Sequence, residues 1–366
     1  MPIFMDRHFV PEANAKAVAE AHREDLAIQG HFGCKCMTYW IDEDRGNVFC
    51  LIDAPDKSAV VNMHQRAHGL VPHEIIEVSA ELVNAFLGRI HDPESVQKNS
   101  DDDLKVFSDP AFRAILIIET LDYVLLQHKV GKESAVEKFR QYNSTVHQQI
   151  RNHKGLNIEL GGVSIVGSFA SITEAMACAQ MIQLAMAELA DELELRLGLH
   201  AGFPVKDHAE LFGSTIRLSK YLCRTGVKNQ LSVSSTIRDF YKQEPKQETP
   251  VRWLSANAEL ALVKLMEVLE SSWQNSEFDT TEFGRLMGMS KSTLYRACLE
   301  LTGQSPNALL QEFRLNQALA LLRSQGRNIA QTTFETGFSS PSYFSKCFQK
   351  RFGLLPLAYL KATSEA

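Results

Sequence analysis

Imidazole and thiol side chains gather in the N-terminal part of the chain. His68 follows His64 by four positions, so the two imidazoles share one face of a helix. Cys34 and Cys36 alternate onto one face of a neighbouring extended segment, just after His31. Neutral imidazole and thiolate together suit Ni(II), Cu, Zn or Co(II). The alternative is ordinary packing, because free cysteine often fills a core and helical histidines often face solvent.

Short hydroxyl side chains and basic side chains begin two helical segments near the other end of the chain. The residues expected on the outer faces are Lys291, Ser292, Tyr295 and Arg296 in the first, and Ser342, Ser345, Lys346 and Lys350 in the second. Such side chains reach base edges and phosphates in a major groove of DNA. This pattern predicts binding to double-stranded DNA.

These two segments belong to a unit that occurs twice. Residues 278–306 read FDTTEFGRLMGMSKSTLYRACLELTGQSP and residues 328–356 read NIAQTTFETGFSSPSYFSKCFQKRFGLLP. A short helix, a turn containing glycine and a second helix form a helix-turn-helix. Gly288 and Gly337 occupy equivalent places and can adopt the left-handed conformation that ends the first helix of each unit.

Local signals predict the helix starts and the buried stripes. In the first unit Thr280 or Thr281 is expected to cap one helix and Ser290 the next, and in the second unit Ser339 or Ser340 has the latter role. The side chains expected to face inward are Phe283, Leu286, Met287, Leu294, Cys298 and Leu301 in the first unit, and Ile329, Thr333, Phe334, Phe344, Phe348 and Phe352 in the second.

The run from about Ala258 to Ala362 resembles the DNA-binding domain of the AraC/XylS transcription regulators. It carries PNALLQEFRLNQALALLRSQ between the two units, then GFSSPSYFSKCFQKRFG, and finally Pro356 followed by Tyr359. The resemblance implies base contacts at Ser292, Tyr295 and Arg296 in the first recognition helix, and at Pro341, Ser342, Ser345 and Lys346 in the second. Many members carry a larger polar residue where Pro341 stands.

Charge agrees with DNA binding at one end only. The whole chain has a formal net charge of −6, whereas residues 285–361 contain ten Lys or Arg against three Glu, a net charge of +7. A basic domain on an acidic body confines phosphate binding to that domain. No long apolar run or signal peptide is evident, and an odd number of scattered cysteines favours reduced thiols, so we expect a cytoplasmic protein without membrane contact.

The histidines and cysteines lie on a predicted βαββαβ pattern within residues 1–80, which indicates a ferredoxin-like sandwich. The expected elements are strands Ile3–Phe9, Phe32–Ile41, Asn47–Ile52 and Glu74–Val78, and helices Ala13–Ile28 and Lys57–Ala67. The open face of such a sheet is expected to pair with a second copy.

This N-terminal segment resembles a small bacterial family of ferredoxin-like proteins, some of which bind nickel. The likeness is strongest in FCLIDAPD and the final IIEV. It implies that Cys50 and His64 are ligands, with His68, Cys36 and Cys34 as further candidates for Ni, Cu or Zn. A small organic effector in the same place is the alternative.

Residues 108–245 resemble the class III nucleotide cyclase domain, best in LRLGLHAG and in LFG…LC…QLSVS. The resemblance places Glu119 at the first metal position and Val163 at the second, Glu159 at the base-reading lysine, and Arg217 and Tyr221 at the positions that orient ribose and stabilise the transition state. Two-metal chemistry needs two carboxylates, and valine offers none. We therefore expect a catalytically inactive domain that sets a dimer or senses a ligand.

The sequence thus predicts a multidomain α+β protein: a ferredoxin-like sensor (1–80), a cyclase-like α/β domain (108–245) and an all-α tandem helix-turn-helix domain (256–366), with YKQEPKQETPVRW as a linker. The expected function is a dimeric, sequence-specific transcription regulator with no catalytic residues, which contacts RNA polymerase if it activates. The alternative is a nucleotide cyclase with residual activity fused to a DNA-binding domain.

Overall fold

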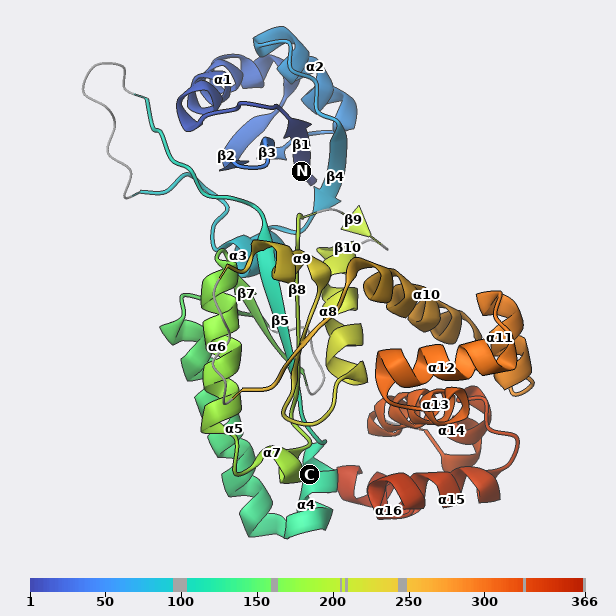
Figure 1. The fold of residues 1–366 in the computed structure, drawn as a ribbon. Helices are drawn as coiled ribbons and strands as arrows, with labels where there is room; N and C mark the ends of the chain where they lie inside the picture. Colours follow the sequence, from blue (N-terminus) through green and yellow to red (C-terminus); the bar gives the residue numbers. More distant parts are fainter. Residues whose placement is uncertain are drawn as a thin grey trace.

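The computed structural model describes residues 1–94, 104–158, 164–204, 206–207, 210–242, 249–324 and 327–364. These residues form a four-stranded sheet, a six-stranded sheet, a two-stranded ribbon and a C-terminal group of helices (Figure 1). Among the helices so described, none is both long and apolar enough to cross a membrane.

The N-terminal domain is a ferredoxin-like sandwich. Its elements are β1 (Ile3–Phe9), α1 (Ala15–Ile28), the 3-10 turn η1 (Gln29–Phe32), β2 (Lys35–Asp42), β3 (Asn47–Asp53), α2 (Lys57–Ala67) and β4 (Glu74–Val78). The strands lie in the order β2-β3-β1-β4 with every neighbouring pair antiparallel. The expected βαββαβ order is therefore confirmed, and the element bounds differ from those expected by at most three residues.

The second face of this sheet is covered within the chain. Met5, Phe49 and Leu51 on that face pack in one buried cluster with α3 (Ala80–Leu87) and with Ile115 of the middle domain. The expectation that this face pairs with a second copy is thus wrong, because α3 and the neighbouring domain already bury it.

The middle domain contains the six-stranded sheet. Its elements are β5 (Arg113–Glu119), α4 (Tyr123–Val130), α5 (Lys132–Asn152), β6 (Leu156–Ile158), β7 (Ser164–Phe169), α6 (Ile172–Ala185), α7 (Ala190–Leu193), β8 (Arg196–Gly202), the ribbon β9 (Lys206–Asp207) and β10 (Glu210–Leu211), α8 (Gly213–Thr225), β11 (Leu231–Val233), α9 (Ser235–Phe240) and β12 (Val251–Trp253). The strand order is β12-β11-β8-β5-β7-β6. Its last four strands are antiparallel and repeat the connectivity of the N-terminal sheet.

The segment expected to be a linker contributes a strand. Residues 251–253 pair in parallel with β11 at the edge of the sheet, and Trp253 stacks on Tyr241 with ring centroids 6.1 Å apart. The described part of the middle domain therefore extends to Trp253, beyond the expected boundary at residue 245.

The C-terminal domain is helical and has two halves. Its helices are α10 (Ala256–Ser272), α11 (Thr280–Met287), α12 (Lys291–Thr302), α13 (Pro306–Arg323), α14 (Ile329–Glu335), α15 (Pro341–Phe352) and α16 (Pro356–Ser364). In Figure 1 α13 lies between the two halves. Both halves rest on the middle domain, because α10 packs against α8 and α16 packs against α4.

Candidate metal centre and nucleic-acid interface

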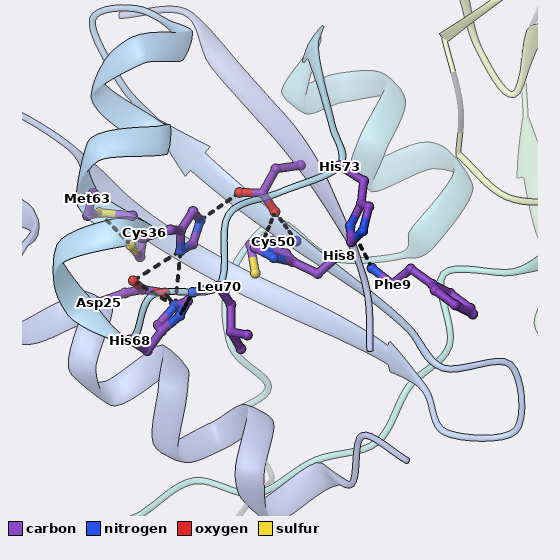
Figure 2. Close-up of polar contacts among 11 residues, drawn as sticks. His8, Phe9, Asp25, Cys36, Cys50, Met63, His68, Leu70 and His73 are labelled. Carbon is purple, nitrogen blue, oxygen red and sulfur yellow. Dashed lines mark hydrogen bonds and ion pairs between the residues drawn. The ribbon is translucent and has the colours of Figure 1, made fainter. Parts of the chain in front are cut away.

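Four buried side chains meet between the N-terminal sheet and its helices. Asp6 and His8 come from β1, Cys50 from β3 and His64 from α2, and one ligand atom of each lies within 4.8 Å of those of the others. Figure 2 shows His8 and Cys50 of this group, with Asp25 and His68 beside them. Asp6 is opposite Cys50 in the antiparallel register. Because residues two apart on a strand share a face, Asp6 and His8 point together toward the helices. We call these four residues, with Asp25 and His68, the His–Asp–Cys cluster.

His64 bridges the two buried carboxylates of this cluster. Its Nε2 lies 2.7 Å from Oδ2 of Asp6, and its Nδ1 lies 3.1 Å from Oδ1 of Asp25 on α1. Nδ1 is also 3.2 Å from Nε2 of His68, which stands one helical turn further along α2. A single imidazole ring therefore joins the strand side of the cluster to the helix side.

The carboxylates favour the protonated form of this imidazole. Burial alone lowers an imidazole pKa, but hydrogen bonds and charge from Asp25 and Asp6 raise the pKa of His64 to about 10. Burial opposes ionisation of Asp6 as well, yet His8 and His64 hold its pKa well below the ordinary value. Burial raises the pKa of the Cys50 thiol. The cluster is thus an imidazolium between carboxylates, beside a neutral thiol.

The donor set also fits a first-row divalent ion. Imidazole, thiol and carboxylate groups converge, and a cavity of about 90 Å³ bordered by His8, Cys50 and His68 adjoins them. An ion held by Asp6, His8, Cys50 and His64 would take the place of protons on the imidazole and the thiol, because a metal binds the deprotonated forms. Without an ion, the same side chains form a network of buried ion pairs in which His64 joins Asp6 to Asp25.

The structure brings together some of the ligands expected from the sequence and separates others. Cys50, His64 and His68 lie in the cluster, whereas Cys34 and Cys36 belong to neither metal-sized group among the described residues. The Sγ atom of Cys36 is 3.7 Å from the sulfur of Met63, and Cys34 donates to the carbonyl of Phe32. In the sheet Cys36 pairs with Ile52, two residues along β3 from Cys50, so its thiol packs in the apolar core.

Sequence reasoning missed Asp6, His8 and Asp25. The alternation of Asp6 and His8 in FMDRHF was a usable signal, because it puts both on one face of the first strand. That signal indicates a metal site only when β1 is known to pair with β3, and this pairing joins segments that are distant in the sequence.

The raised pKa of His64 predicts that the metal-free chain loses stability as pH rises. An imidazolium with a folded pKa of about 10 stabilises fully below its unfolded pKa of 6.5, and this contribution is lost as pH rises through the folded value. Urea unfolding in a chelator should give a smaller free energy at about pH 8.5 than at about pH 6. His64→Gln should reduce that difference, and equal slopes in the two proteins would contradict an imidazolium.

The second helices of the two repeated units, α12 and α15, present their polar residues to solvent. Lys291, Ser292 and Arg296 are exposed and Tyr295 is 50% exposed, while Leu294 anchors the helix. On α15 the exposed residues are Ser342, Lys346 and Lys350, with Ser345 half-buried. Pro341 is at the first turn, where a missing N–H is harmless.

The capping signals are mostly confirmed. Gly288 and Gly337 have φ values of 69° and 73°, and Ser290 and Ser340 cap α12 and α15. The cap of α11 is Asp279, which accepts from the N–H groups of residues 281 and 282, so the expected threonine cap is wrong. A carboxylate that directly precedes the helix and accepts two N–H groups displaces the weaker hydroxyl cap.

Two expected core positions are exposed. Leu286 is 38% exposed and Phe334 is 59% exposed, whereas the aromatic stripe of Phe344 and Phe348 is fully buried. The first helix of each unit has only about two turns, and only one side of it is buried. Over so few residues the hydrophobic pattern does not show which apolar side chains at the border of that side remain exposed.

Arg314 joins the helix between the two halves of the C-terminal domain to the end of α10. Arg314 of α13 donates through Nε to the carbonyl of Trp273 at the end of α10, at 2.8 Å, and through Nη2 to the carbonyl of Asn275, at 2.7 Å. Gly337 lies against the same place, where an added Cβ would stand 2.4 Å from the Trp273 carbonyl. We call Trp273, Arg314 and Gly337 the interhelical joint.

The residues aligned with cyclase machinery serve structural contacts. Glu119 accepts from Ser164 at 2.9 Å and pairs with Arg224 at 3.4 Å. Tyr221 donates to Glu270 of α10 at 2.7 Å, and Arg217 pairs with another α10 carboxylate. The remaining two aligned positions, 159 and 163, lie outside the described residues.

Comparisons with known proteins match both ends of the chain. Residues 284–362 match the family described as "Helix-turn-helix domain", and residues 4–78 match "Nickel responsive protein SCO4226-like". Each match covers about a fifth of the chain, so each characterises its own segment.

Individual relatives also match segments. "Histidine kinase P4" of Formosa agariphila is 38% identical over 112 residues, or 31% of this chain and 8% of that protein. A solved transcriptional regulator with an AraC-type DNA-binding domain, from Chromobacterium violaceum, is 25% identical over 30% of this chain and 98% of that one, with a TM-score of 0.28. SCO4226 of Streptomyces coelicolor A3(2) is 32% identical over 21% of this chain and 94% of that one, with a TM-score of 0.20. The chain thus spans under a tenth of the kinase's length.

Proposed function

We propose that this chain, whose C-terminal residues form a helix-turn-helix domain of the AraC type, is a sequence-specific transcription regulator controlled by a first-row divalent metal ion. The observation that carries the proposal is the pair of capped recognition helices whose polar and basic side chains are exposed within a matched DNA-binding family. We take the protein to act on double-stranded DNA as a homodimer in the cytoplasm, and to contact RNA polymerase where it activates.

Each of the two recognition helices would contact one major groove of the DNA. Ser292, Tyr295 and Arg296 on α12 would enter one major groove. Ser342, Ser345 and Lys346 on α15 would enter the next groove on the same face of the DNA. The exposed lysines of these helices, Lys291, Lys346 and Lys350, would supply phosphate contacts that fix the register.

The metal ion belongs to the N-terminal domain in this proposal. The matched family is described as nickel responsive, and the His–Asp–Cys cluster offers the nitrogen and sulfur donors that nickel accepts. An ion there would supply a charge that ties β1, β3 and α2 together. Phe49 and Leu51 of the N-terminal domain pack against the middle domain, so a change at the metal site could reach the middle domain through these contacts.

We assign the middle domain to a cyclase-like fold without catalysis. The strand order β8-β5-β7-β6, with α6 packed on one face of the sheet and α8 on the other, supports this assignment. Glu119 is paired with Arg224, and both Arg217 and Tyr221 engage carboxylates of α10. Arg217 and Tyr221, which align with nucleotide-contacting positions, instead bind α10 of the DNA-binding domain. We therefore propose that the middle domain acts in dimerisation and in signal transfer.

Selection from a random DNA pool tests the proposal directly. The full chain, loaded with NiCl₂ or stripped with a chelator, should enrich one sequence with two contacted segments in adjacent major grooves, and the affinity should differ between the two states. Enrichment of no sequence in either state would refute the DNA-binding proposal. Equal affinity in both states would refute control by the metal.

Two substitutions should separate base contacts from phosphate contacts. Arg296→Ala should cost on the order of 1–3 kcal/mol at the selected site and little on random DNA, because a base-edge contact carries sequence information. Lys350→Ala should weaken binding to both DNAs alike and flatten the salt dependence. Fluorescence anisotropy at several salt concentrations measures both effects. Equal losses on both DNAs for Arg296→Ala would contradict its assignment.

A further inference from the structure

The contact between the middle domain and the DNA-binding domain encloses a charged cavity. Its volume is about 260 Å³, and it is bounded by the ends of β5 and β8, by α8, by the linker helix α13 and by the last turn of α15. The volume lies below the roughly 300–1,000 Å³ typical of sites for drug-sized ligands, so an occupant would be small. We call this space the interdomain cavity.

Ion pairs across this boundary hold the two domains together. Asp122 at the start of α4 is 2.7 Å from Arg323 of α13. Glu194 beside β8 is 3.0 Å from Arg351 of α15, and Lys228 lies 3.3 Å from the same carboxylate. Burial would raise the pKa of Glu194, but Arg351 and Lys228 lower it below its ordinary value. The carboxylates on this boundary are therefore already neutralised.

Cations remain in excess after these pairs are counted. Five cationic side chains line the interdomain cavity against four carboxylates: Arg196, Lys220, Arg224, Arg323 and Arg351 against Glu119, Asp122, Glu194 and Glu312. Among the described residues Lys220 has no hydrogen-bond or ion-pair partner, and the Arg196 side chain bonds only to a backbone carbonyl, that of Arg224. Its Nε is a buried donor without a hydrogen-bond acceptor. A buried donor left in this way is costly unless something accepts from it.

We propose that the interdomain cavity binds a small phosphate-bearing molecule between Arg196 and Lys220 of the middle domain and α13 of the DNA-binding domain. A tetrahedral dianion offers several acceptor oxygens, which suits converging guanidinium and ammonium donors better than a single carboxylate does. The side chain of Asn316 lines the α13 side, where its amide can donate to the same group.

The occupant would tie the DNA-binding domain to the middle domain. It would touch β8 and α8 on one side and α13 on the other, the helix that joins the two helix-turn-helix units. A ligand that contacts two domains favours the arrangement in which both contacts form. A regulatory effect of this ligand rests on the proposed function. Binding of the ligand can be measured without DNA, so the binding site and the proposed function can be tested separately.

Isothermal titration calorimetry of the full chain tests the site, with glycerol 3-phosphate and inorganic phosphate as probes and succinate as the anion control. We expect saturable binding of a phosphate probe at one equivalent, and no comparable binding of succinate. Tighter binding of glycerol 3-phosphate would identify an organic phosphate as the occupant, and tighter binding of inorganic phosphate would identify the free ion. No saturation of either at about 10 mM would overturn the proposal.

Four variants localise the binding. Lys220→Ala should weaken the phosphate probe at least about tenfold, and Lys220→Arg should restore most of the affinity because it keeps the charge. Asn316→Asp, on the other wall, should weaken it similarly by repelling the anion. Lys132→Ala, an exposed lysine of the same domain outside the cavity, is the matched control and should leave affinity unchanged. Equal binding by all four variants would place the anion elsewhere and overturn the proposal.

Discussion

Replacing His64 with alanine should lower the free energy of unfolding of the metal-free chain by about 3–5 kcal/mol at neutral pH, because removing one partner of a buried ion pair leaves the other charge uncompensated. Asp6 and Asp25 are both buried and both depend on this imidazole. The same substitution should abolish stoichiometric nickel binding, since His64 is the member shared by both metal-sized groups.

Two cysteine variants separate the stability effect from the metal effect. Cys50→Ser keeps the imidazolium and its carboxylates, so it should lose the metal with little change in the metal-free chain. Cys34→Ser removes a buried thiol of the same domain outside the cluster and should change neither property by much. Elemental analysis of nickel-loaded protein and urea unfolding in a chelator give the two readouts. Full metal occupancy in His64→Ala would exclude that residue as a ligand.

Replacing Gly337 with alanine should destabilise the second helix-turn-helix unit by about 2–5 kcal/mol. A left-handed conformation costs a residue with a Cβ roughly 1–2 kcal/mol, and forcing a new atom into a packed site adds about 1–3 kcal/mol. That atom would stand 2.4 Å from the Trp273 carbonyl and 2.9 Å from Nε of Arg314. Specific DNA binding should fall with it, because α15 begins directly after this turn.

The equivalent glycine of the first unit is the matched control. Gly288 has φ 69° against 73° for Gly337, but an added Cβ there would meet nothing within 4 Å. Gly288→Ala should therefore show the conformational cost alone. Chemical denaturation of the two variants measures the difference. A similar loss of unfolding free energy in both variants would mean that the residues around Gly337 can move to accommodate the added methyl group.

The helix-turn-helix units were predictable because their signals are local. A left-handed glycine and a serine cap act within one turn of helix, so the sequence indicates where α12 and α15 begin. The exposure of Leu286 and Phe334 was not predictable, since the periodicity of a helix of two turns does not fix the edge of its buried face. The strand at residues 251–253 was missed because its parallel pairing with β11 joins two segments that are separated in the sequence.

The composition of the His–Asp–Cys cluster shows where sequence reasoning ends. His64 and His68 share a face through helical spacing, and that part was accessible. Asp6 joins them only through the register that sets it opposite Cys50, and Asp25 only through the packing of α1 against α2. Cys36 shares the core but not the cluster, because its strand position pairs it with Ile52.

The interhelical joint has a consequence for the proposed complex with DNA. In the proposed complex with DNA, Arg314 ties α13 to the end of α10 and the turn at Gly337 packs against the same carbonyl, so we expect α12 and α15 to keep one relative position. The duplex must then adjust its own bend and groove width to meet both helices at once. Because stiffness differs between base steps, the base pairs between the two contacted grooves should influence affinity although no side chain reaches them.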